Sequence, residues 1–227
     1  MLRRAKQVSK TIKVADAVAR IPDGAVLMIG GFMGVGTPHR LVAEIVRQGK
    51  KNLTVIANDT AKPGLGIGLL ISAGLVARAI VSHIGTNPET QAKMIAGQIA
   101  VELVPQGTLI ERIRAGGYGL GAVVTATGVG TVVAEGKRTI DIDGRTFLLE
   151  MPLRADFALV NARQADHIGN LAYALTARNF NPVIAMAADV VLAEAQEIVP
   201  VGVIPPDAVL TPSVIVNHII SRETVRG

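Results

Sequence analysis

The sequence predicts an α/β fold: one open, mostly parallel β-sheet with helices on both faces. Short apolar runs alternate with segments of helical periodicity along most of the chain, which is typical of repeated βαβ units. Hydrophobic residues make up 49% of the 227 residues but aromatic residues only 3%, so aliphatic side chains must build the core, as in sheets covered on both faces. The length suits one large domain, and no linker or internal repeat divides it.

Strands and helices are expected in alternation over the first half of the chain. Short apolar runs bounded by turn residues predict strands over 25–29, 53–57, 77–82 and 100–104. Helical spacing predicts helices over 14–21, 41–46 with Gly49 as the stop, 67–73, from Asn87 to Gly97, and from Leu109 to Gly116-Gly117. With right-handed crossovers, the carboxyl ends of these strands meet on one edge of the sheet.

The second half is less regular. Residues 115–134 carry six Gly, three Thr and no charge, and we expect a buried, loop-rich segment there instead of a membrane helix. Two alternating arms around Asp143-Gly144 predict a small hairpin insertion near 138–149 with a type I′ turn. Beyond it we expect strands over 155–160 and 189–193, a loop over 166–173, a helix from Asn181-Pro182, and an irregular, proline-rich end.

The formal net charge of +5 is confined to the start of the chain. Five basic residues precede the first acidic one, Asp16, and the remaining 18 basic residues balance 18 acidic ones. We therefore expect a basic, solvated tail over residues 1–13, a single domain over 14–227 and no nucleic-acid binding. There is no Cys, which excludes disulfides and thiolate sites, and no secretory or membrane segment is visible. These observations predict a cytoplasmic protein that binds no membrane.

A glycine-rich loop follows the first predicted strand, with the sequence Gly30-Gly31-Phe32-Met33-Gly34-Val35-Gly36. Thr37 is predicted to cap the next helix and Pro38 to begin it, so the free N–H groups of that helix would favour an anion. The dinucleotide motif fails because position 39 is His, and the phosphate-loop motif fails because Thr37 stands where Lys is required. The loop is equally consistent with ligand binding and with plain packing of a helix on a strand.

Amides and hydroxyls dominate the other predicted strand ends: Asn58, Thr60, Thr86, Asn87, Gln106 and Thr108. Such groups suit a polar neutral ligand or a thioester oxygen, but they are poor general bases. His83 could act as a base, although a His bonded to local backbone is the better interpretation, and Asp59 is best interpreted as a cap for nearby N–H groups. No His pair has metal-ligand spacing and no Gly-x-Ser-x-Gly is present. The chain therefore supplies either half of a shared active site or a binding module.

Several short motifs are spread over nearly the whole chain beyond the first 13 residues. The first runs from Asp23-Gly24 through Leu27-Met28-Ile29 and Gly30-Gly31-Phe32 to Gly36-Thr37-Pro38. The others are Asn58-Asp59-Thr60, the segment 82–90, Pro105-Gln106-Gly107-Thr108-Leu109, and the segments 114–117, 127–131 and 177–182. Each is weak alone, but together the motifs are specific. The chain resembles the α subunits of two-subunit, family I CoA-transferases, most closely the acetate/acetoacetate (butyrate–acetoacetate) type.

This resemblance implies an active site shared between two chains. In that family a glutamate of the β subunit attacks acyl-CoA, and a glutamyl–CoA thioester forms in a ping-pong cycle. By resemblance, the loop from Gly30 to Gly36 would lie along CoA, Asn58 and Asp59 would contact it, and Gln106 would support the thioester oxygen. CoA and acyl-CoA would be substrates, with no metal and no permanently bound cofactor.

The activity implied by the resemblance is transfer of CoA between a short-chain acyl-CoA, such as acetyl-CoA, and acetoacetate or another short carboxylic acid. The chain would work with a β subunit, as α2β2. Two alternatives remain open. One is a transferase for a 3-oxodicarboxylate such as 3-oxoadipate, which the segment from His83 to Thr90 disfavours. The other is a CoA- or nucleotide-binding module without catalysis.

Overall fold

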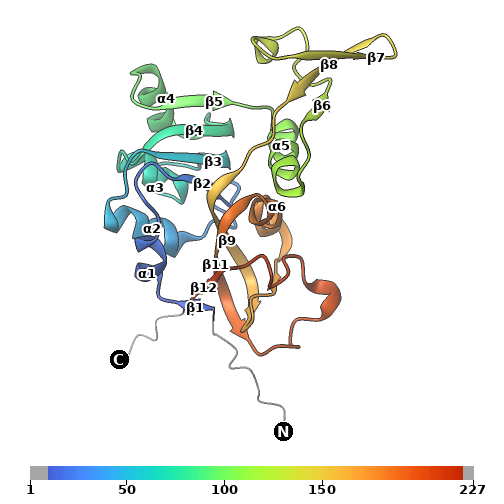
Figure 1. Ribbon diagram of the computed structural model, residues 1–227. Coiled ribbons are helices and arrows are strands. Elements are labelled where there is room, and N and C mark those ends of the chain that lie inside the picture. The colour runs from blue at the N-terminus through green and yellow to red at the C-terminus, as the bar shows by residue number, and fades with distance from the viewer. Residues whose placement is uncertain (1–9, 222–227) are drawn as a thin grey trace.

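The computed structural model describes residues 10–221, which are organised around one nine-stranded sheet (Figure 1). Its strands are β1 (Thr11–Ile12), β2 (Val26–Ile29), β3 (Leu53–Asp59), β4 (Val76–His83), β5 (Ala100–Leu103), β9 (Ala155–Asp166), β10 (Leu171–Ala172), β11 (Ala188–Val199) and β12 (His218–Ile220). The order is β1-β12-β11-β9-β2-β3-β4-β5 with every pair parallel, and β10 pairs antiparallel with β9. The predicted open, mostly parallel sheet is confirmed.

Helices cover both faces of this sheet. The helices are α1 (Val14–Ala19), α2 (His39–Gln48), α3 (Ile67–Ser72), α4 (Pro88–Ile95), α5 (Gln106–Tyr118), α6 (Asn181–Met186) and the short 3-10 helices η1 (Val132–Ala134), η2 (Leu175–Arg178) and η3 (Pro206–Ala208). α1, α2 and α3 pack on one face, and α5 and α6 on the other. Because side chains alternate along a strand, Leu27 and Ile29 enter the first core and Met28 the second.

A second, three-stranded antiparallel sheet stands beside α5 (Figure 1). It consists of β6 (Val123–Thr125), β7 (Thr139–Ile142) and β8 (Arg145–Glu150), in the order β6-β8-β7. Asp143 and Gly144 both have positive φ, 50° and 75°, as a type I′ turn requires, so the predicted hairpin is confirmed. The segment 115–134 is loop-rich as predicted, with loops over 119–122 and 126–131, but the prediction that it is buried is wrong. α5 continues to Tyr118, which is 59% exposed, and Val123–Thr125 then pairs with β8 at the surface.

The strands of the second half of the chain also differ from the sequence expectations. β9 and β11 are 12 residues each, longer than predicted, because small buried residues such as Ala162, Ala165 and Ala195 carry little strand propensity but pack well in the sheet. The segment 166–173, predicted as a loop, instead contains the last residue of β9 and the short strand β10. Of the segment predicted as a basic tail, residues 1–9 lie outside the described range, while Thr11–Ile12 pairs with β12. No helix within residues 10–221 is long and apolar enough to cross a membrane.

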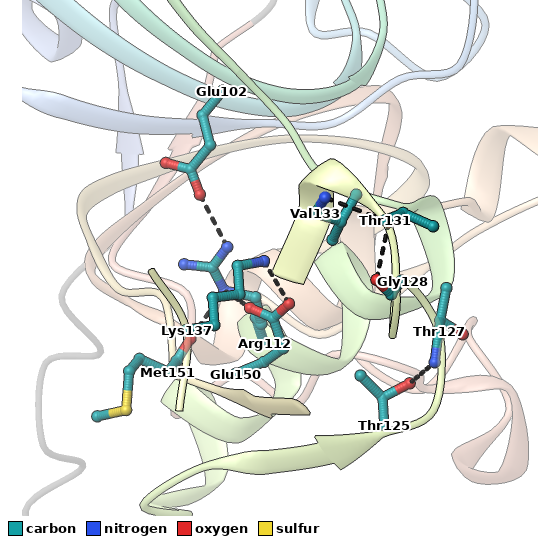
Figure 2. A network of polar contacts seen from close by, with 10 residues as sticks. All are labelled: Glu102, Arg112, Thr125, Thr127, Gly128, Thr131, Val133, Lys137, Glu150 and Met151. Carbon is teal, nitrogen blue, oxygen red and sulfur yellow. Dashed lines mark hydrogen bonds and ion pairs between the residues drawn. The ribbon is translucent and has the colours of Figure 1, made fainter. Parts of the chain in front are cut away.

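Ion pairs hold the small sheet against α5 (Figure 2). From α5, Arg112 donates to Glu102 Oε1 at 2.9 Å and to the carbonyl oxygen of Met151 at 2.8 Å, and its Nε lies 3.8 Å from Glu150 Oε2. Lys137 Nζ donates to the other Glu150 oxygen at 2.5 Å. Glu150 is only 2% exposed, and the positive charges of Arg112 and Lys137 compensate its buried negative charge.

Glu102 extends the network to the main sheet. Burial opposes ionisation of this carboxyl, but hydrogen bonds from Arg112 and from Arg78 on β4 outweigh burial and hold the pKa of Glu102 below its ordinary value. α5 is thereby tied at Arg112 both to the main sheet and to the small sheet. Because α5 begins with Gln106, the network helps to fix the helix that carries a candidate site residue.

Replacing Arg112 tests this anchorage. Arg112→Ala leaves the buried Glu150 with one cation fewer, and we expect the free energy of unfolding to fall by about 3 kcal/mol. Arg114, on the same helix, pairs with Glu111 at the surface, so Arg114→Ala is the matched control and should cost about 0–1 kcal/mol. Urea denaturation of both variants measures the difference, and equal losses would contradict the anchoring role.

Candidate active site

A cavity of about 270 Å³ lies at the carboxyl edge of the main sheet, where β2, β3, β4 and β5 end. It is lined by Phe32, Met33, Asn58, Asp59, Ser82, His83 and Gln106. Ligand sites of open α/β sheets lie at this edge. The fold therefore brings together five of the residues predicted for the site with His83, the candidate base, and it adds Ser82 from the end of β4.

A line of hydrogen bonds fixes the side-chain amide of Gln106. The Asp59 carboxylate accepts from Asn58 Nδ2 at 2.7 Å, so Asn58 turns its Oδ1 away and accepts from Gln106 Nε2 at 2.8 Å. A carboxylate can only accept, and this determines the orientation of both amides. Gln106 Nε2 carries a second hydrogen, for which residues 10–221 provide no acceptor. Gln106 thus presents an N–H donor at the cavity wall.

Asp59 also holds two strained turns. Its carboxylate accepts from the backbone N–H of Met33 at 3.0 Å and from that of Ala61 at 2.6 Å. Met33 and Ala61 have φ of 51° and 54°, in the left-handed region that non-glycine residues rarely adopt. Asp59 is 3% exposed and Asn58 1% exposed. The interpretation of Asp59 as a cap for nearby N–H groups is confirmed, and the cap reaches as far as the glycine-rich loop.

The glycine-rich loop is a tight hairpin turn. Phe32 and Val35 exchange two backbone hydrogen bonds of 2.9 Å, and Met33 and Gly34 between them have φ of 51° and 87°, as in a type I′ turn. The turn leaves Phe32 and Val35 each 49% exposed. His39 Nε2 lies 3.1 Å from the Gly34 carbonyl oxygen and supports the turn from the start of α2.

Two of the loop glycines are required by close approach of another segment of this chain. A Cβ on Gly30 would lie 1.9 Å from Asn181 Oδ1, and a Cβ on Gly36 would lie 2.4 Å from the Ala177 carbonyl oxygen. Both contacts come from the segment that leads into α6. At these positions the packing interpretation is correct, because the missing Cβ makes room for the chain itself.

Asparagine side chains of the same segment clamp the loop. Asn179 Oδ1 accepts from the Gly31 N–H at 3.1 Å, and its Nδ2 donates to the Val35 carbonyl oxygen at 2.9 Å. Asn181 Nδ2 donates to the Gly36 carbonyl oxygen at 2.9 Å. Sequence reasoning missed these roles: it identified the segment 177–182 as a motif but gave no function to its asparagines. The loop is therefore held in shape without any ligand.

The start of α2 is occupied by a side chain of this protein. The predicted cap and first residue are each wrong by one position, because Pro38 occupies the cap position and the helix begins at His39. Glu194 Oε2, from β11, accepts from the N–H groups of Arg40 at 3.0 Å and Leu41 at 3.1 Å. The carboxylate of Glu194 fills the place where a bound anion was expected. Burial raises the pKa of Glu194, although these N–H bonds and the charge of Arg40 oppose the shift.

Other polar residues predicted at the strand ends serve the fold. Asn87 Oδ1 accepts from the Thr90 N–H at 3.2 Å and caps α4 as predicted, while its Nδ2 donates to the Thr60 carbonyl oxygen at 2.9 Å. His83 lines the cavity and is exposed; within residues 10–221 it makes no hydrogen bond, so the expected bond to local backbone is absent. In the same range no three His, Cys, Asp or Glu side chains gather as a metal site.

Comparison with known proteins identifies the family. The family model described as coenzyme A transferase matches residues 11–222. The chain belongs to the coenzyme A transferase family. This confirms the resemblance drawn from the motifs, and the fold agrees with it.

Two curated relatives of this coenzyme A transferase chain align along nearly their whole length. The chain is 56% identical over 212 residues to acetate CoA-transferase subunit alpha of Escherichia coli (strain K12), covering 93% of this chain and 96% of that protein. It is 47% identical over 214 residues to the acetoacetyl-CoA:acetate/butyrate CoA transferase alpha subunit of Clostridium acetobutylicum, covering 94% and 98%.

One solved structure supports the fold. The acyl-CoA transferase YdiF of E. coli O157:H7, solved as a thioester complex with CoA, matches with a TM-score of 0.84 at 22% identity. The match covers 94% of this chain but 47% of that one, so the coenzyme A transferase chain described here spans about half the length of that protein.

One prediction from this site concerns the loop clamp. Gly36 and Gly24 have nearly the same φ, 78° and 79°, but a Cβ on Gly24 would meet no atom within 4 Å. Both alanine variants carry a backbone cost of about 1–2 kcal/mol. Gly36→Ala should lose roughly a further 1–3 kcal/mol because its Cβ collides with the Ala177 carbonyl. Denaturant unfolding compares the pair, and equal stabilities would show that the approach of Ala177 is not tight.

Another prediction from this site concerns Glu194 and pH. A carboxyl whose folded pKa is raised destabilises the fold when ionised, so its penalty is present at neutral pH and disappears as pH falls toward its ordinary value of 4.5. Wild type should therefore gain stability relative to Glu194→Gln as pH falls from 7 to 4.5. Urea denaturation of both proteins across this range measures the gain. Parallel pH profiles would mean that Glu194 titrates normally.

Proposed function

We propose that this chain is the α subunit of a coenzyme A transferase that moves CoA between a short-chain acyl-CoA and acetoacetate or another short carboxylic acid. The observation that carries the proposal is the oriented amide of Gln106 on the wall of the cavity. The one carboxylate among the lining residues, Asp59, is already occupied by three donors, so it is poorly suited to be a nucleophile. The relatives named for acetate, acetoacetyl-CoA and butyrate support the substrate class.

In this proposal the nucleophile is a glutamate of a β subunit that docks over the cavity in an α2β2 assembly. The glutamate adds to the thioester carbonyl carbon and expels the CoA thiolate, leaving a mixed anhydride. The thiolate then attacks the glutamyl carbonyl, releases the first acid and leaves a glutamyl–CoA thioester. The acceptor acid runs the same two steps in reverse and leaves as the new acyl-CoA. No net proton or electron is exchanged, and neither a metal nor a permanently bound cofactor takes part.

Gln106 stabilises the negative charge that develops on the thioester oxygen. Its second N–H is the donor, and the hydrogen bonds through Asn58 to Asp59 orient that donor before substrate arrives. A donor that need not reorganise during the reaction is the most effective kind of electrostatic catalyst. Asn58 and Asp59 act here as positioning residues, and they meet the reactive end of CoA from the cavity wall.

CoA itself is proposed to lie along the loop from Gly30 to Gly36. Phe32 lines both the cavity and a neighbouring groove of about 610 Å³, which Val35, Leu175, Thr176, Arg178 and Asn179 complete. The groove combines the apolar side chains of Phe32, Val35 and Leu175 with the polar side chains of the other three residues, which suits a pantetheine arm that carries amide groups between methylene groups. Its exposed Phe32 and Val35 are held out by the turn described above.

The test is CoA exchange between acetyl-CoA and acetoacetate by the chain assembled with its β subunit. Removing an oxyanion donor costs roughly 10²–10³ in rate, so Gln106→Ala should lower kcat by that factor and leave KM nearly unchanged. Gln98 is exposed and precedes β5, at the opposite edge of the sheet, so Gln98→Ala is the matched control and should retain full activity.

Three results would change the proposal. Absence of exchange by the wild-type complex with several short acids would overturn the activity. Preference for 3-oxoadipate over acetoacetate would replace the substrate class. A kcat of Gln106→Ala within about twofold of wild type would mean that this chain binds CoA without taking part in catalysis, because loss of an oxyanion donor lowers the rate far more than that.

A further inference from the structure

Gly107 is a glycine that the chain itself does not require. It is the second residue of α5, and its φ lies outside the left-handed region. A Cβ built on it would meet no atom within 4 Å. Glycine in a helix loses more conformational freedom on folding than alanine does, so the residue destabilises the first turn of α5 with no gain in packing.

This sets Gly107 apart from the other glycines. Among residues 10–221, each of the others has a positive φ or a close neighbour, with one exception, Gly121. Gly30, Gly36 and Gly116, for example, each face an atom at 2.4 Å or less. Gly121 lies in the exposed connection between α5 and β6. Gly107 directly follows Gln106 and is exposed at the edge of the sheet where the cavity lies.

The space over Gly107 is bordered by unused donors. The first hydrogen bond of α5 runs from the Leu109 N–H to the Pro105 carbonyl oxygen at 2.8 Å, and Pro105 offers no capping side chain. The backbone N–H groups of residues 106–108 have no acceptor within the described range. Thr108 Oγ1 has no partner there either, but it is buried and does not reach the open space. The open space therefore adjoins groups that can bind an acyl oxygen.

We propose that Gly107 is kept free of a side chain to admit the acyl group of the substrate, and that it sets the acyl length that the enzyme accepts. This inference rests on the function proposed above. With the acyl oxygen at the Gln106 amide, the carbons attached to the carbonyl extend over the first turn of α5. A β-carbon at position 107 would occupy the room of about one methyl group there.

The experiment measures donor selectivity of the assembled complex carrying Gly107→Ala. In a ping-pong cycle, kcat/KM for the donor reports only the first half-reaction, so acetyl-, propionyl- and butyryl-CoA can be compared with one acceptor. A methylene group in a pocket changes selectivity about 10–200-fold. We expect the butyryl-to-acetyl ratio of kcat/KM to fall at least about tenfold, toward the lower end of that range.

Stability supplies the second measurement. Alanine at a compatible glycine position should stabilise the chain, so the Tm of the Gly107→Ala complex should rise by roughly 1–3 °C. A variant that is more stable but rejects longer acyl groups cannot owe its loss of activity to misfolding. Gly121→Ala is the matched control: it should also fold stably and leave the ratio unchanged.

Each alternative result overturns the inference. If Gly107→Ala leaves the butyryl-to-acetyl ratio of kcat/KM unchanged, the open space over Gly107 does not hold the acyl group. Equal losses for all donors, together with weaker association of the β subunit in sedimentation, would assign the space to the partner chain. A change of the same size in Gly121→Ala would show that the effect is not local. Failure of the proposed function differs from all of these, because the wild-type complex itself would then transfer no CoA.

Discussion

The carboxylate of Asp59 is the constraint on which this edge of the sheet depends. It stands at the end of β3 and accepts hydrogen bonds from Asn58, from the loop after β2 and from the turn after β3. Because this carboxylate can only accept hydrogen bonds, it determines which way the Asn58 amide is turned. The orientation of Asn58 in turn determines that Gln106 offers an N–H donor. Asp59 and Asn58 are buried and hydrogen-bonded, which makes this part of the network rigid, while the second N–H of Gln106 is left unused. One acid thus fixes both the orientation of the Gln106 amide at the start of α5 and the shape of the glycine-rich loop after β2.

α5 connects this edge to the small sheet. Gln106 begins the helix, and Arg112, less than two turns later, is held by carboxylates of β5 and β8. Gly116 lets the backbone of Leu153 approach the helix, where a Cβ would lie 2.0 Å from the Leu153 carbonyl oxygen. The helix is therefore held at its middle by Arg112 and near its end by the close approach of Leu153 to Gly116. Its first turn remains open, which suits a surface that meets substrate.

Local patterns in the sequence were enough to predict the sheet, its helices and most of the cavity. Gly49 and Asn87 end and begin helices by local chemistry, and the alternation of strands brings Asn58 and Gln106 to one edge. Glu194 could not be found this way. It meets the start of α2 from more than 150 residues away, and no local pattern records such a contact. The roles of individual glycines were also hard to predict from the sequence. The same residue type forms a turn at Gly34, allows a close approach at Gly36 and leaves open space at Gly107.

The order of the strands has a consequence for synthesis of the chain. β2, β3, β4 and β5 are contiguous in sequence and adjacent in the sheet. The bond from Gln106 to Asn58, and those from Asn58 and the Met33 N–H to Asp59, can therefore form once α5 has emerged. The clamp on the glycine-rich loop needs Asn179, which lies 73 residues further along. At roughly 5–20 residues per second, translation separates the two by about 4–15 seconds. During that interval β2 is an open edge of the nascent sheet, and the arrival of β9 both closes the edge and brings the segment that clamps the loop.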